Sequence, residues 1–132
     1  MNAMFSQKQI LLVASALGTF AVSLGAFGAH ALKSHLVPYD RLDTWELAVR
    51  YHFYHTFALL VVALLMDKFP SAGLKQSALL FLIGIILFSG SLYVLCLLNI
   101  SKIAIITPFG GAFLIAGWVT FFVSVYRYHK RD

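Results

Sequence analysis

The chain alternates between four long apolar runs and shorter polar stretches. The runs cover about residues 10–29, 46–66, 75–98 and 107–126. A helix of about 20 apolar residues crosses the roughly 30 Å hydrocarbon core of a bilayer, so each run is long enough for one span. The pattern predicts an all-α integral membrane four-helix bundle, in which residues 1–132 form a single domain.

One long polar connection separates the first and second runs. Pro38 ends any helix that precedes it, and Asp43 or Thr44 is a suitable N-cap for the helix that becomes the second span. Trp45 has the amphipathic character of a residue at the membrane–water interface. We therefore expect a partly helical connection between the first two spans, followed by a capped helix.

The second run carries two histidines one helical turn apart, His52 and His55. On a helix that turns about 100° per residue, they share one face with Ala48 and Leu59, while Phe57 lies opposite. Ionisable side chains within spans almost always face the interior of the protein rather than lipid. The two histidines should therefore point inward.

Small residues mark where the spans should pack closely. Lipid removes the hydrophobic drive between helices, so they associate where small residues let two backbones approach. The predicted packing residues are Gly18, Gly25, Gly28, Gly90, Gly110, Gly111 and Gly117. Ser89 and Ser91 in the third run are expected to bond to carbonyl groups of their own helix, which would leave them in need of no other partner.

The composition agrees with insertion into a membrane. Only 11% of the residues are charged and 61% are hydrophobic, whereas about a quarter of the residues in a soluble domain are charged. The net charge of +5 is scattered over the chain ends and connections. It forms no basic stripe, which argues against a nucleic-acid partner. The single cysteine, Cys96, lies in an apolar run and is expected to be an inert packing residue.

The distribution of cations predicts the orientation. Four spans place both termini on one side of the membrane, together with Lys8, Lys68, Lys75, Arg127, Lys130 and Arg131. The other side carries Lys33, Arg41, Arg50 and Lys102, which is four cations against six. Because cytoplasmic segments of membrane proteins carry the excess of Lys and Arg, both termini are predicted to be cytoplasmic.

The even number of spans also gathers polar side chains at the end of the bundle opposite the termini. This predicted cluster consists of His30, Tyr51, His52, His55, Tyr93, Asn99 and Thr107. His55 is expected to be buried and hydrogen-bonded to His30, Tyr93 or Asn99. His35 should lie exposed in the long connection, where its replacement by alanine would cost almost no stability.

Three interpretations of the cluster stay open. The histidines can bond to backbone carbonyls and hold the long connection over the bundle. They can line a pocket for a quinone, another amphiphile or a lipid headgroup. They can also bind a metal or haem, although a pair spaced i, i+3 indicates this only weakly, and no metal site or cofactor is predicted. A phosphate-binding loop, a dinucleotide-binding glycine fingerprint and paired carboxylates within a span are all missing from the sequence, so nothing favours an enzyme.

Four ordered motifs carry a family resemblance. LGAFGAH at 24–30, YHFYHTFALL at 51–60, FSGSLY at 88–93 and TPFGGAFLIAGW at 107–118 resemble a widespread bacterial family of small four-span inner-membrane proteins, classed as domain of unknown function four-two-three, with related small transmembrane proteins in animals. The matching positions are Gly25, Gly28, His30, His55, Ser89, Gly90, Ser91, Tyr93, Thr107, Pro108, Gly110 and Gly111. The resemblance implies an inner-membrane protein with no established activity and no catalytic residues.

These observations lead to one expectation and one alternative. We expect a non-enzymatic inner-membrane protein that acts through a membrane-protein partner, a further copy of itself or a bound membrane lipid. The alternative is a membrane protein that binds a quinone, haem or metal through the histidine cluster.

Overall fold

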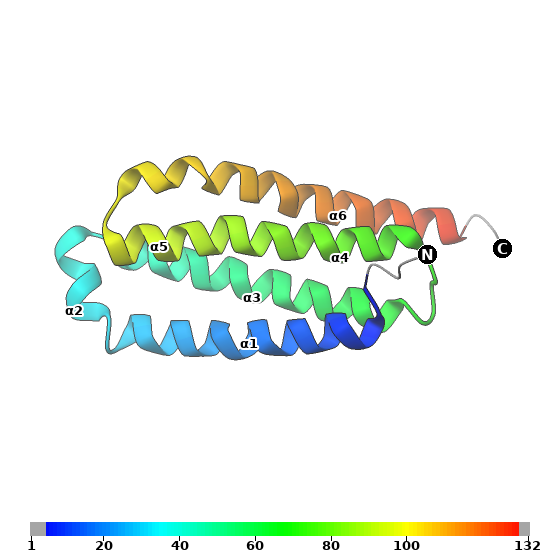
Figure 1. Ribbon diagram of the computed structural model, residues 1–132, viewed down its shortest axis with the longest axis horizontal. Helices are drawn as coiled ribbons and strands as arrows, with labels where there is room; N and C mark the ends of the chain where they lie inside the picture. Colours follow the sequence, from blue (N-terminus) through cyan, green and yellow to red (C-terminus); the bar gives the residue numbers. More distant parts are fainter. Residues whose placement is uncertain (1–4, 130–132) are drawn as a thin grey trace.

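A computed structural model describes residues 5–129 (Figure 1). For His129 it describes the backbone alone. The elements are α1 (Gln7–Ala29), α2 (Lys33–Leu36), the 3₁₀ turn η1 (Val37–Tyr39), α3 (Leu42–Leu65), α4 (Ala72–Ile85), the π-helical segment η2 (Ile86–Gly90), α5 (Ser91–Leu98), the 3₁₀ helix η3 (Ser101–Ile105) and α6 (Thr107–His129). No strand occurs among residues 5–129. α4, η2 and α5 follow one another without a break and form one long helix.

Four helical stretches are long and apolar enough to cross a membrane: Gln7–Ala29, Leu42–Leu65, Ala72–Leu98 and Ser101–Tyr128. α1 has 23 residues and is therefore about 34 Å long at 1.5 Å per residue, slightly longer than the hydrocarbon core. The predicted fold class, an all-α four-helix membrane bundle, is confirmed. The connection between the first two spans is partly helical through α2 and η1, as expected.

The spanning helices stand side by side in chain order (Figure 1). α1 packs against α3, α3 packs against the continuous α4–η2–α5 helix, and α6 packs against α4. α3 and the third span form the middle of the bundle and are more buried than α1 and α6. We call the end where α1 begins and α6 ends the terminal end. The opposite end, which carries α2, η1 and η3, is the connection end.

Small residues of α1 let α3 lie close to it. Ala14 and Ala21 are completely buried, and any side chain at Gly28 would collide with the Trp45 indole. Trp45 donates from Nε1 to the Leu24 carbonyl oxygen of α1 at 2.9 Å. The Trp45 side chain is only 1% exposed and so does not extend outward as an anchor, because its N–H finds a partner on α1 and its ring fills the space over a glycine.

A second close contact joins the third span to α6. A Cβ atom at Gly110 would collide with the backbone of Phe88, and one at Gly117 would lie 2.7 Å from Phe81 Cδ1. The Ser77 hydroxyl donates to the Gly117 carbonyl oxygen at 2.9 Å. Gly110 and Gly117 therefore let α6 and the third span approach, as predicted.

The other predicted packing glycines are less tightly held. A Cβ atom at Gly18 or Gly111 would have its nearest neighbour at 3.8 Å, an ordinary contact, and one at Gly25 would lie 3.4 Å from Val49 Cγ1. A Cβ atom at Gly90 would have no neighbour within 4 Å in the described chain apart from the backbone of its own helix and its chain neighbours. The prediction is wrong for Gly90, because its open side meets no other helix.

The long connection is held to the loop after α5. Arg41 donates from Nε to Asn99 Oδ1 at 3.0 Å and from Nη2 to Ser101 Oγ at 2.7 Å. Nε2 of His35 lies 3.0 Å from the Leu97 carbonyl oxygen, so that nitrogen donates. His35 is exposed, as predicted, but it has a partner and so contributes to holding the connection in place.

The start of α3 differs from the prediction. α3 begins at Leu42, with Arg41 as its N-cap residue and no capping side chain. Asp43 and Thr44 therefore lie inside the first turn and do not cap the helix. The chain turns at Asp40, which has a left-handed φ of 53°, and is anchored at Arg41. Because the turn at Asp40 and the anchored Arg41 already set the direction of the chain, the helix begins before Asp43 and Thr44.

Candidate functional site

His52 lies in the interior, on the face of α3 that the sequence predicts, and is only 4% exposed. Its Nδ1 lies 3.1 Å from the Tyr93 hydroxyl of α5, and the Tyr93 ring packs on Trp45 with 4.9 Å between ring centroids. Nε2 nevertheless has no hydrogen-bond partner among the residues that the structure describes. Among the buried side-chain nitrogen and oxygen atoms of the described residues, this is the only one without a hydrogen-bond partner.

His55 is also buried, and both of its ring nitrogens are used by the protein. Nδ1 lies 2.8 Å from the Tyr51 carbonyl oxygen, and the Trp118 indole N–H of α6 donates to Nε2 at 3.2 Å. A carbonyl can only accept, so the proton of the neutral ring is on Nδ1 and the lone pair is on Nε2. In this arrangement His55 keeps no lone pair for a metal ion.

The predicted partners of His55 were His30, Tyr93 and Asn99, and this prediction is wrong. The actual side-chain partner, Trp118, comes from α6. α6 packs against α4 and η2, and this brings the Trp118 indole N–H to the His55 imidazole. The sequence had predicted partners from the connection end instead.

The remaining predicted cluster residues lie in separate places. Thr107 Oγ1 is 2.8 Å from Ser91 Oγ, Asn99 holds Arg41, and His30 is exposed at the end of α1. Across the described chain, no three His, Cys, Asp or Glu side chains converge to hold a metal ion. The polar residues therefore form several pairs instead of one cluster.

The π-helical segment η2 shapes the middle of the third span. The Ser89 hydroxyl donates to the Ala48 carbonyl oxygen of α3 at 2.7 Å. The expectation that Ser89 bonds within its own helix is wrong, because the extra residue of a π turn shifts the following side chains around the helix. Ser91 does bond to its own helix, at the Phe88 carbonyl, 2.9 Å away. Tyr51 stacks on the Phe88 ring, with 4.6 Å between centroids.

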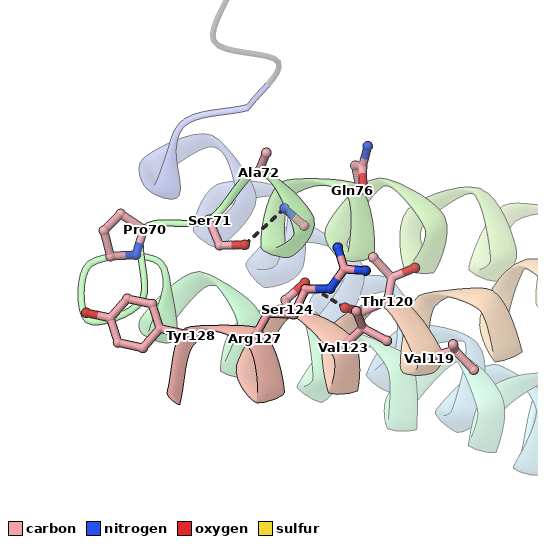
Figure 2. A pocket seen from close by; sticks show the side chains of 11 residues that line it. Pro70, Ser71, Ala72, Gln76, Val119, Thr120, Val123, Ser124, Arg127 and Tyr128 are labelled. Atoms are coloured by element: carbon pink, nitrogen blue, oxygen red, sulfur yellow. Dashed lines mark hydrogen bonds between the residues drawn. The ribbon is translucent and has the colours of Figure 1, made fainter. Parts of the chain in front are cut away.

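A groove at the terminal end lies outside the predicted cluster (Figure 2). It runs between the beginning of α4 and the last turns of α6 and has a volume of about 960 Å³. Ligand pockets usually have volumes of about 300–1,000 Å³. The α6 wall consists of Val119, Thr120, Val123, Ser124, Arg127 and Tyr128, and the facing wall of residues 70–73 and Gln76. We call it the α4–α6 groove.

Short contacts order each wall of this groove, and one of them joins the two walls. Ser71 caps α4 by accepting from the Gly73 amide at 3.1 Å. Gly73 lies so close to the Ser124 hydroxyl that no side chain fits between them. The Ser124 hydroxyl itself donates to the Thr120 carbonyl oxygen at 2.6 Å. The first and third contacts lie within α4 and within α6, and the approach of Gly73 to Ser124 is the one that joins the two helices.

Two side chains define the open end of the groove. Figure 2 shows the Arg127 side chain lying over the groove, with its guanidinium turned toward Gln76 of α4. Tyr128 stands opposite Pro70, and its ring packs edge-on against Phe69 with 4.8 Å between centroids. The guanidinium therefore points away from Tyr128 and lies nearer to Thr120.

Sequence reasoning missed this groove, although one signal was present. Thr120, Ser124 and Arg127 recur at spacings of four and three, so they share one face of α6. Gln76 is the polar residue in the first turns of the facing helix. The sequence does not reveal that these two polar stretches face each other, since this depends on the packing of α4 against α6.

Comparison with known proteins places the chain in a family. A family model described as "Protein of unknown function (DUF423)" matches residues 24–111, which is more than half of the chain. The chain belongs to this family. The resemblance inferred from the four motifs is therefore confirmed. No solved structure matches the chain.

Several curated relatives are named as membrane proteins. The UPF0382 membrane protein YwdK of Bacillus subtilis is 41% identical over 122 residues, which cover 92% of this chain and 98% of the relative. A UPF0382 membrane protein of Haemophilus influenzae is 45% identical over 115 residues, 86% and 89% of the two chains. The UPF0382 inner membrane protein YgdD of Escherichia coli is 34% identical over 126 residues, 96% and 95%. The protein is thus a membrane protein.

Proposed function

We propose that this DUF423 protein is a non-enzymatic, multi-pass protein of the cell inner membrane that holds a membrane lipid in the α4–α6 groove. The observation that carries the proposal is the lining of the groove. One cation, Arg127, and one amide, Gln76, line it next to the apolar side chains of Val119 and Val123. A phospholipid likewise joins a polar headgroup to apolar chains.

The side chains of the groove favour binding over chemistry. They supply hydroxyl groups, one amide and one guanidinium, with no histidine, carboxylate or thiol among the lining residues. A serine or threonine hydroxyl needs a neighbouring base to act as a nucleophile, and the groove offers none. The buried histidines do not supply this base either, because both lie on α3, which contributes no residue to the lining of the groove.

The charge distribution supports an orientation with both termini in the cytoplasm. Six cations on the terminal side against four on the other favour this arrangement. Two of the six, Lys130 and Arg131, lie outside the described residues. The E. coli relative is named an inner membrane protein. In this orientation the α4–α6 groove opens toward the cytoplasmic leaflet.

One observation favours a second candidate, the binding of an amphiphile such as a quinone at the histidines. The unpartnered Nε2 of His52 is a buried polar atom that a ligand group could satisfy. The His52 side chain is only 4% exposed, however, so a ligand would reach it only after α1 moved away from α3. The groove needs no such movement, and we therefore place lipid binding first.

The proposal is tested by filling the groove. Val123 lines it, so the bulky indole of the variant Val123→Trp should displace the lipid. Ile115→Trp is a matched control, because Ile115 is 66% exposed on α6 and does not line the groove. We expect native mass spectrometry of protein purified in mild detergent to show bound lipid on the wild type and on Ile115→Trp, and a loss of that lipid from Val123→Trp. Equal lipid retention by both variants would contradict the proposal.

A further inference from the structure

We infer that the α4–α6 groove selects a phospholipid with an anionic headgroup, which the guanidinium of Arg127 binds through a phosphate oxygen pair. This inference rests on the proposed function, because it specifies the class of lipid in the same groove. It is carried by the charge, the depth and the hydrogen-bonding groups of the lining residues.

The side chains that line the groove carry positive charge only. Arg127 is the only charged side chain among the lining residues, and no carboxylate is present there to neutralise it. Its guanidinium lies over the groove (Figure 2). A planar guanidinium binds phosphate with two parallel N–H bonds, which gives it a specificity that a lysine ammonium lacks. An anionic group is therefore the ligand that this end of the groove fits.

The depth of the residues leaves room for an acyl chain. Arg127 stands two residues before the end of α6. Figure 2 shows its side chain folded back along the helix, with the guanidinium near Thr120 and Val123. Val119 lies four residues before Val123, so it is about 6 Å deeper along the helix. A phosphate at the guanidinium would thus leave an acyl chain running along Val119 and further into the membrane.

Neutral polar side chains add hydrogen-bond donors near the Arg127 guanidinium. The Gln76 amide and the Thr120 hydroxyl line the groove, and phosphate oxygens accept from both kinds of group. The Ser124 hydroxyl is already engaged with the Thr120 carbonyl oxygen and is not needed. The ammonium group of a zwitterionic headgroup would meet no carboxylate in the groove. The lining therefore favours an anionic phospholipid over a zwitterionic one.

The test compares two lipids that have the same acyl chains and headgroups of different net charge. The full-length protein is stripped of lipid in detergent and titrated, with native mass spectrometry as the readout. The probes are phosphatidylglycerol, phosphatidylcholine with the same acyl chains, and inorganic phosphate alone. We expect the wild type to prefer phosphatidylglycerol by about tenfold or more, because the choline ammonium of phosphatidylcholine would lie near the Arg127 guanidinium with no carboxylate in the lining to bind it.

Matched variants identify the residue responsible. Arg127→Gln should abolish the preference, whereas Lys68→Gln removes one cation from the same end of the bundle without touching the groove and should leave the preference intact. The inference is overturned if Arg127→Gln keeps the preference, if the two variants behave alike, or if inorganic phosphate binds while phosphatidylglycerol does not. If the preference is absent but Val123→Trp still loses lipid, only this inference fails. If Val123→Trp also keeps its lipid, the proposed function fails with it.

Discussion

Replacing Gly110 by alanine adds a single methyl group where α6 meets the third span. That carbon would collide with the amide nitrogen of Phe88 and would lie 2.7 Å from the carbonyl carbon of Leu87. Carbon atoms in good contact are about 3.5–4.0 Å apart, so α6 would have to move away by about 1 Å. The obstructing atoms belong to a helix backbone, which cannot rotate aside as the end of a flexible side chain can.

The expected cost follows from two opposing effects. Overpacking costs about 1–3 kcal/mol, and exchanging glycine for alanine within a helix contributes about 0.8–1.0 kcal/mol in the opposite direction. We expect Gly110→Ala to lower the free energy of unfolding by up to about 2 kcal/mol. Gly90→Ala is the matched control, because no atom lies within 4 Å of its added carbon. This variant should be as stable as the wild type or up to about 1 kcal/mol more stable.

The measurement is reversible unfolding of both variants in mixed micelles with increasing SDS, followed by circular dichroism. The difference between the two variants, about 1–3 kcal/mol, isolates the contact, because both exchange the same atoms in a helical backbone. Equal free energies of unfolding for Gly110→Ala and Gly90→Ala would show that α6 does not press against the third span at this position.

Three further predictions address the interior and the orientation. A double-mutant cycle with His55→Ala and Trp118→Phe should give a coupling energy of about 0.5–1.5 kcal/mol in unfolding, and additive effects would exclude the hydrogen bond between them. Cys96 is completely buried, so a maleimide should label it only after denaturation; rapid labelling of the folded protein would contradict this. A reporter at the C-terminus should read cytoplasmic and one inserted within residues 36–44 external, whereas the reverse pair would invert the proposed topology.

Much of the fold could be predicted from the sequence because the signals are local. The length of each apolar run indicates a span, and helical periodicity alone turns His52 and His55 inward, where both are found. The start of α6 at Thr107 also follows from local chemistry, since a proline in the first turn costs no hydrogen bond.

The partners of the polar side chains could not be predicted because they depend on which helices are neighbours. Trp118 bonds to His55 from 63 positions away in the chain. Trp45 looked like an interface residue, but a glycine on α1 makes room for its ring in the interior. The α4–α6 groove exists only because the first turns of one helix face the last turns of another.

The chain-order packing of the spans bears on how the protein assembles during synthesis. Each new spanning helix packs against the one made immediately before it: α3 on α1, α4 on α3, and α6 on α4. A helix leaving the insertion machinery therefore finds its docking surface already in the membrane, and it does not wait for a segment still to be translated. Contacts between neighbours in sequence close short loops and form quickly. Assembly of this protein should accordingly proceed one span at a time, with the groove between α4 and α6 completed last.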